Sequence, residues 1–324
     1  MRGSEVRRKA VVLLMAGILA TLWQCDLCAQ TKLKIAVISK GTTHIFWKSV
    51  EAGARAAGKD LGVEIIWKGP LKENDRAQQI AIVEQFVTEG VSGIVLAPLD
   101  DTALIRPVGA AAQRQIPVLI LDSGLKGEPG RDFVSFVATD NKRAGNLGGE
   151  HLGQLLRGNG KVVLLRYQVG SASTTEREEG FLAAVRRIKG VQVLVDNRYA
   201  GPTVGDAKTA SLNLVDKLKE AGGIFCPNES TTFGMLLALR QSNLAGKVKF
   251  VGFDTSPPLV EALERGEIDA LVAQDPARMG YEGVKLLVEY LRGKKVPTAV
   301  DTGARLITRQ NLDTPEIRRL LGRP

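Results

Sequence analysis

The chain has 324 residues, of which 44% are hydrophobic and 24% charged, and its formal net charge is +9. This length holds one large or two medium-sized domains, and the composition is typical of a globular protein rather than a disordered one. The 44 basic residues are scattered among 35 acidic ones, without a basic helix or an aromatic RNA-binding stretch. We therefore interpret the charge as a solvated surface, and we expect no nucleic-acid partner.

Residues 1–29 have the pattern of a secretory signal peptide, so we exclude them from the fold. A basic start that ends at Lys9 precedes an apolar run over 10–23, which is short for a membrane span. Ala29 offers a small residue for cleavage. An uncleaved amphipathic anchor and a lipoprotein modified at Cys25 are the alternatives. With this leader, we expect the mature protein in the periplasm.

From residue 32 onward, short apolar runs alternate with longer amphipathic stretches. The expected strands are residues 35–38, 63–67, 93–97, 117–121, 133–138, 161–165, 191–195, 223–226, 248–253, 270–273 and 305–308. The expected helices are residues 46–61, 75–89, 102–114, 142–156, 176–188, 205–220, 231–242 and 277–292. This alternation is typical of βαβ units, and it starts again after a glycine-rich break at 158–160. We predict an α/β fold with two doubly wound parallel-sheet lobes of about five strands each.

The loop between the first strand and the first helix concentrates unusual side chains. It carries Lys40, His44, Phe46 and Trp47, although only 5% of the chain is aromatic. Ligands of open α/β sheets bind beyond the carboxyl ends of the strands, so this loop is a candidate ligand wall. Phe46 falls on the predicted apolar helix face together with Val50, which leaves core packing as its alternative role. Trp47 falls off that face and is predicted to offer a flat surface to the ligand.

Sequence motifs for cofactor or metal chemistry are absent. The sequence contains no dinucleotide or phosphate-binding glycine motif, no zinc-protease motif and no serine nucleophile elbow. The two histidines are His44 and His151, and we interpret His151 as a structural residue of a helix. We therefore predict neither a cofactor nor a metal site, and a carboxylate-based enzyme remains as an alternative.

Polar residues recur just past the ends of the predicted strands. They are Lys40, His44, Asp100, Asp101, Asp122, Asp140, Asn141, Asn228, Asp254, Gln274 and Asp275. Capping of the following helix explains any one of them. Together with Phe46, Trp47 and Arg177 they suit a sugar, because carboxylates, amides and guanidinium groups pair with its hydroxyls while aromatic rings stack on its C–H faces.

Several short stretches carry a resemblance to a known family. They are IFWKSVEAGA (45–54), LILDSG (119–124), ATDN (138–141), SASTTEREEGF (171–181), FCPN (225–228), VGFD (251–254) and AQDP (273–276). Over residues 32–308 the chain resembles the type I periplasmic solute-binding proteins, in the ribose-binding and related monosaccharide-binding branch. Each stretch is unspecific alone, but their order and spacing together are characteristic.

The resemblance implies two lobes that are joined by three crossovers and close over one ligand in a central cleft. The crossovers are expected near 138–141, 274–276 and 302–306. The first lobe then comprises residues 31–139 and 275–303. The second lobe comprises residues 140–274 and 304–324.

The resemblance also implies which side chains contact the ligand. The expected ligand-binding residues are Lys40, His44, Phe46, Trp47, Asp122, Ser123, Arg177, Asn228, Asp254 and Gln274. Phe46 and Trp47 match the stacking aromatics of the ribose-binding pattern. The sequence departs from that pattern where His44 replaces an asparagine and Ser123 replaces an arginine. These differences favour the broad prediction of a monosaccharide ligand over the narrower prediction of ribose.

The function implied is that of an exported, monomeric receptor that binds a monosaccharide and delivers it to a membrane ABC permease. Lys40 and the stretch 67–70 also resemble the branch that binds the furanosyl signal autoinducer-2, so a signalling ligand is an alternative. A cytoplasmic regulator with the same core needs a DNA-reading unit before the first strand, where this chain has a mostly apolar leader. A sugar enzyme with a carboxylate site is the third alternative.

Overall fold

The protein is described from a computed structural model, which covers residues 32–323. Within this range, the residues from Lys34 onward form one compact unit. The predicted signal peptide, including Cys25, lies outside the described residues. Among the helices that are described, none is both long and apolar enough to span a membrane.

The first sheet has six parallel strands in the order β2-β1-β3-β4-β5-β11. Their bounds are β1 (Lys34–Ile38), β2 (Glu64–Lys68), β3 (Gly93–Leu96), β4 (Val118–Leu121), β5 (Phe136–Ala138) and β11 (Ala299–Asp301). The central strands β3 and β4 are buried along their whole length. Continuous apolar runs of this kind are typical of parallel strands that helices cover on both faces.

The second sheet repeats this order with strands β7-β6-β8-β9-β10-β12. Their bounds are β6 (Asn159–Arg166), β7 (Gly190–Tyr199), β8 (Gly223–Phe225), β9 (Lys249–Phe253), β10 (Ala270–Gln274) and β12 (Ala304–Thr308). Only β12 runs antiparallel to its neighbour within this sheet. The two sheets thus have equivalent strands: β4 corresponds to β9, and β5 corresponds to β10.

Eleven helices lie among the described residues. They are α2 (Ile45–Leu61), α3 (Arg76–Glu89), α4 (Ile105–Gln113), α5 (Asn141–Leu155), α6 (Ala172–Arg186), α7 (Val204–Leu212), α8 (Val215–Glu220), α9 (Glu229–Gln241), α10 (Pro257–Glu264), α11 (Pro276–Leu291) and α12 (Pro315–Leu320). We call the first sheet with α2, α3, α4 and α11 the first lobe. The second sheet with the remaining helices is the second lobe.

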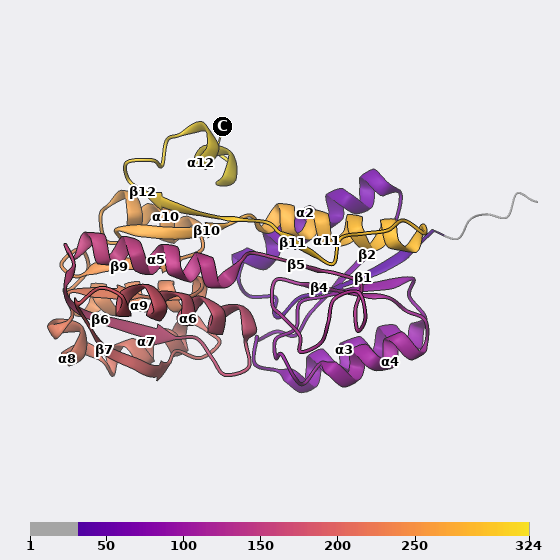
Figure 1. The fold of residues 1–324 in the computed structure, drawn as a ribbon, viewed down its shortest axis with the longest axis horizontal. Helices are drawn as coiled ribbons and strands as arrows, with labels where there is room; N and C mark the ends of the chain where they lie inside the picture. The colour runs from indigo at the N-terminus through magenta and orange to yellow at the C-terminus, as the bar shows by residue number, and fades with distance from the viewer. Residues whose placement is uncertain (1–31, 324) are drawn as a thin grey trace, which may run out of the picture. The chain divides into compact units, whose positions relative to one another are not determined.

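The chain passes between the two sheets three times, at β5–α5, β10–α11 and β11–β12. Because of these passages, the late helix α11 lies beside the early helix α2 in the first lobe (Figure 1). The three passages fall where the family resemblance implies crossovers. The prediction of two α/β lobes with parallel sheets is confirmed.

Some elements differ from the prediction. Residues 205–220 are not one helix, because α7 ends at Leu212 and α8 begins at Val215. Helices α10 and α12 and the short edge strand β11 are not among the predicted elements. The sheets therefore contain six strands each rather than about five.

Candidate functional site

A small cavity between the two sheets brings together nine of the ten predicted ligand-binding residues. They are Lys40, His44, Phe46, Trp47, Asp122, Arg177, Asn228, Asp254 and Gln274. Four further residues, which the sequence analysis did not predict, complete the lining: Glu73, Ser173, Thr174 and Glu229. The volume open to the centres of water molecules is about 30 Å³. The tenth predicted residue, Ser123, is buried beside the cavity, where its hydroxyl accepts a hydrogen bond of 3.1 Å from the Ser173 amide.

Two aspartates occupy equivalent positions in the two sheets. Asp122 follows β4, and its amide donates to the Val137 carbonyl at 2.9 Å. Asp254 follows β9, and its amide donates to the Val272 carbonyl at 2.9 Å. Their φ angles of 61° and 68° lie in the left-handed region, which is unfavourable for residues other than glycine. Such backbone strain is concentrated at functional sites.

Helix capping explains other polar residues of the pattern but not these two aspartates. The side chains of Asp140, Asn228 and Asp275 each accept a hydrogen bond from the first turn of the following helix. Asn228 does this at the start of α9 while also lining the cavity. The carboxylate of Asp122 instead contacts polar side chains of the cavity. That of Asp254 contacts Gln274 and the first amide of α9, so neither aspartate caps the helix that follows it in the chain.

Arg177 is the central cation of the cavity. Its guanidinium donates to Asn141 Oδ1 at 2.8 Å and to Gln274 Oε1 at 2.9 Å, and a third bond of 3.0 Å reaches the Pro227 carbonyl. The group also lies 4.0 Å over the Phe253 ring. Burial lowers the pKa of Arg177, while nearby Asp254 and Asp122 oppose that shift.

A close helix contact fixes the position of Arg177. A Cβ atom placed on Gly145 of α5 would lie 1.9 Å from the Arg177 carbonyl oxygen, so a larger residue would force α5 and α6 apart. Only glycine permits backbones to approach this closely. The glycine at this point of α5 therefore helps to aim the guanidinium at the cavity.

Lys40 and Asp122 form a buried ion pair at the opposite wall. The Lys40 Nζ atom lies 3.0 Å from Asp122 Oδ2 and also donates to the Ser173 hydroxyl at 2.9 Å. The other Asp122 oxygen lies 4.0 Å from an Arg177 nitrogen. Asp122 therefore lies between two cations, one from each lobe.

Asp254 is paired through Gln274 rather than directly with a cation. Gln274 Nε2 donates to Asp254 Oδ1 at 2.7 Å, and the second Asp254 oxygen accepts from the Glu229 amide at 2.8 Å. Burial raises the pKa of Asp254 to about 6, although the charge of Arg177 and the bond from Gln274 oppose the shift. A further hydrogen-bond donor, such as a hydroxyl group, would therefore stabilise the ionised form of the buried Asp254 carboxylate.

Glu73, which no sequence pattern indicated, holds the aromatic end of the cavity. One of its oxygens, Oε1, lies 2.7 Å from His44 Nδ1 and accepts from Trp47 Nε1 at 2.7 Å. The other accepts from the Tyr167 hydroxyl at 2.9 Å. Burial alone would raise the pKa of Glu73, but His44, Lys40 and Trp47 lower it to about 2. Burial likewise opposes the charged form of His44, yet Glu73 raises the pKa of His44 to about 9.

The two aromatic residues at the start of α2 contribute differently from the prediction. Trp47 was predicted to fall off the buried helix face, but it is 3% exposed and lies on that face with Val50 and Ala54. Trp47, Val50 and Ala54 have the spacing of one helix face, and the bond to Glu73 satisfies the buried indole N–H. Phe46 is half-buried and meets the Trp47 ring edge to face at 5.0 Å. Both rings line the cavity.

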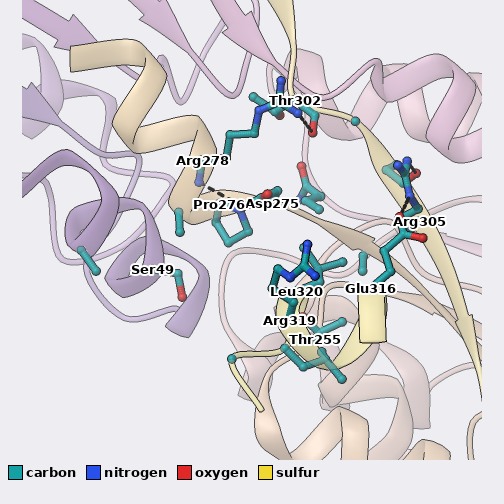
Figure 2. A pocket seen from close by; sticks show the side chains of 18 of the residues that line it. Ser49, Thr255, Asp275, Pro276, Arg278, Thr302, Arg305, Glu316, Arg319 and Leu320 are labelled. Atoms are coloured by element: carbon teal, nitrogen blue, oxygen red, sulfur yellow. Dashed lines mark hydrogen bonds and ion pairs between the residues drawn. The ribbon is translucent and has the colours of Figure 1, made fainter. Parts of the chain in front are cut away.

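A larger groove lies beside two of the chain passages between the sheets. By the same measure its volume is about 690 Å³, and it is lined by parts of α2 and α12 with the segments 273–278 and 301–305. Figure 2 shows Ser49, Arg278 and Arg319 around this groove. Gln274 is the only one of the ten predicted residues that lines it. The predicted ligand-binding residues therefore lie around the smaller cavity rather than around this groove.

The donor and acceptor set of the cavity suits a neutral polyhydroxy ligand. Four carboxylates, two amides, a guanidinium and an ammonium offer both donors and acceptors to hydroxyl groups. Among the residues with described positions, no cluster of three His, Cys, Asp or Glu side chains is arranged to hold a metal ion. The arrangement favours recognition by hydrogen bonds and aromatic contact.

Most of the chain matches the model of one protein family. Residues 35–295 match the model described as "Periplasmic binding protein domain". The chain belongs to the periplasmic binding proteins of type I, in the monosaccharide branch. This match includes every predicted ligand-binding residue of the chain and ends before the edge strands β11 and β12.

Individual relatives agree with this family. The chain is 28% identical over 306 residues to the ribose import binding protein RbsB of Haemophilus influenzae, which covers 93% of this chain and 99% of the relative. A carbohydrate transporter solute-binding protein of Agrobacterium radiobacter, solved with D-arabinose, has a TM-score of 0.86 at 34% identity and covers 90% and 99% of the two chains. A solute-binding protein of Agrobacterium vitis, solved with D-fucose, has a TM-score of 0.85 at 35% identity, with coverages of 89% and 99%.

Proposed function

We propose that this protein binds a monosaccharide in the cavity between its two lobes. The observation that carries the proposal is the pair of strained, buried aspartates that faces Arg177, Lys40 and two amide side chains beside an aromatic wall. A buried site of this kind rejects ligands without matching hydroxyls, because its own polar groups would be left unpaired. The relatives with D-arabinose and D-fucose support a sugar as the ligand class.

The wider role that we propose is that of the substrate-binding component of an ABC importer. The protein would be exported to the periplasm by a cleaved signal peptide, would act as a monomer, and would hand its ligand to a membrane permease without converting it. The residue ranges 31–139 with 275–303, and 140–274 with 304–324, are proposed as the moving lobes. The relatives named for ribose import support this role.

Thermal unfolding with a panel of solutes tests the proposal. The panel contains pentoses, hexoses, a furanosyl signal, amino acids and nucleosides. A sugar at about 100 times its dissociation constant is expected to add roughly 2.7 kcal/mol to the free energy of unfolding. Stabilisation by a non-carbohydrate solute, with no effect of any sugar, would contradict it. Conversion of the sugar during incubation, lost in Asp122→Asn, would favour an enzyme instead.

Asp254 gives a prediction for ligand affinity. We expect Asp254→Ala to weaken sugar binding at least about tenfold, which corresponds to about 1.4 kcal/mol, because the carboxylate accepts hydrogen bonds from ligand hydroxyls. Isothermal titration at pH 7.5 measures the change. Asp269→Ala is the control, because this aspartate lies at the far end of the same sheet and pairs with Lys249. Near-normal affinity of Asp254→Ala would remove Asp254 from the site.

The same residue predicts a pH dependence. Since the pKa of Asp254 is about 6, the carboxylate is protonated as the pH falls below that value and loses acceptor capacity. Sugar affinity is therefore expected to fall between pH 7 and pH 5, and titrations at half-unit steps follow this fall. Affinity that stays constant across this range would show that Asp254 is not titrating in the free site.

A further inference from the structure

The first helix of the first lobe lacks a cap from its own residues. The N-cap of α2 is His44, whose side chain makes no capping bond because its ring is held by Glu73. The first amide groups of a helix need acceptors, since no carbonyl within the helix reaches them. The acceptor comes from the other lobe: Glu229 Oε1 accepts from the Ile45 amide at 3.2 Å, and Oε2 accepts from the Phe46 amide at 3.0 Å.

This contact exists only while the two lobes are together. Glu229 is the first residue of α9, which packs on the second sheet, whereas α2 packs on the first. Lys40, Arg177 and Asp254 are each less than 8% exposed. A ligand therefore reaches these residues only if the lobes separate, and separation removes Glu229 from α2.

Glu229 is also joined directly to the ligand-facing groups. Its amide donates to Asp254 Oδ2 at 2.8 Å, and Asn228 precedes it in the chain. One residue thus connects the carboxylate proposed to bind the sugar with the helix that carries Phe46 and Trp47. A carboxylate that bonds two helix amides is a charge-assisted contact, and the positive end of the helix dipole strengthens it.

We propose that Glu229 is a latch that holds the closed state by capping α2 from the opposite lobe. The proposal rests on the proposed function, because it concerns closure over the same ligand. As a positioning residue, Glu229 acts on the stability of the closed state rather than on recognition of particular hydroxyls. Its loss is therefore expected to speed ligand release by one common factor for every sugar that binds.

The test compares Glu229→Gln with Glu51→Gln in stopped-flow binding of at least two sugars. Glu51 lies on α2 and pairs with Arg55 of the same helix, so its variant makes the same charge change without touching the other lobe. We expect Glu229→Gln to raise the dissociation rate constant about tenfold, because the variant loses a charge-assisted hydrogen bond that stabilises the closed state. The association rate constant is expected to change less than about twofold. Glu51→Gln is expected to match the wild type.

Two outcomes would overturn the latch. An unchanged dissociation rate in Glu229→Gln would show that the cap contributes nothing to closure. A factor that differs strongly between sugars would make Glu229 a direct ligand contact instead. Neither outcome resembles failure of the proposed function, in which the wild type itself binds no sugar. The ligand-free melting temperature of both variants, expected to equal that of the wild type, shows that they fold.

Discussion

Replacement of Arg177 by alanine is expected to abolish measurable sugar binding and to lower the free energy of unfolding by about 3 to 5 kcal/mol. The guanidinium satisfies Asn141, Gln274 and the Pro227 carbonyl, and all of these groups are in the buried interior. Its removal also takes away the positive charge that favours the carboxylate of Asp254, while Asp122 keeps only Lys40 as its cation. Uncompensated buried charges and unpaired polar groups account for both losses.

Urea denaturation and isothermal titration measure the two effects of Arg177→Ala. The matched control is Arg186→Ala on the same helix, where the exposed guanidinium pairs with Asp196 at the surface. Surface ion pairs contribute at most about 1 kcal/mol, so this control is expected to retain stability and binding. If Arg177→Ala still bound the sugar with near-normal affinity, the assignment of the cavity as the ligand site would be wrong.

Glu73 gives the second large effect, which concerns stability. We expect Glu73→Gln to lower the free energy of unfolding by about 3 kcal/mol at pH 6, because the change removes the anion that pairs with buried, protonated His44. It also weakens the bonds that hold Trp47 and Tyr167. Chemical denaturation measures the loss. Glu84→Gln on the exposed face of α3 serves as the control and is expected to leave stability within about 0.5 kcal/mol of the wild type.

The Glu73–His44 pair also sets a pH window. The pKa of Glu73 falls from 4.5 to about 2, so its stabilisation is present above pH 4.5 and is lost as the pH falls towards 2. The pKa of His44 rises from 6.5 to about 9, so its stabilisation is present below pH 6.5 and is lost as the pH rises through 9. The pair therefore contributes most between about pH 4.5 and 6.5. A wild type and a Glu73→Gln variant with parallel stability curves from pH 6.5 to 9 would contradict this coupling.

Much of the fold follows from local patterns in the sequence. The apolar runs that became β3 and β4 are bounded by turn residues, and burial on both faces makes such runs easy to recognise. The elements that were missed carry weak signals. Strand β11 has three residues and mixed polarity, and its place at the edge depends on β5. Helix α10 is the exception, because its start carries a recognisable signal, a serine before two prolines in the first turn.

The site was predictable only where its residues follow strand ends or match a family pattern. Asp122 and Asp254 satisfy both conditions. Glu73 satisfies neither, because it lies in a loop and acquires its role from His44, Trp47 and Tyr167, which are distant in sequence. Glu229 follows the predicted Asn228, but its role depends on the opposite lobe. Trp47 was misplaced for a different reason: Trp47, Val50 and Ala54 also have the spacing of one helix face, so periodicity did not decide between Phe46 and Trp47 as its first residue.

A crystal structure of the protein with the sugar that most raises its melting temperature tests the central claim most directly. We expect the sugar in the cavity between the sheets, with its hydroxyls bonded to Asp122, Arg177 and Asp254 and a ring face against Phe46 or Trp47. A sugar found instead in the groove lined by Arg278 and Arg319, with the cavity between the sheets unchanged, would contradict the account.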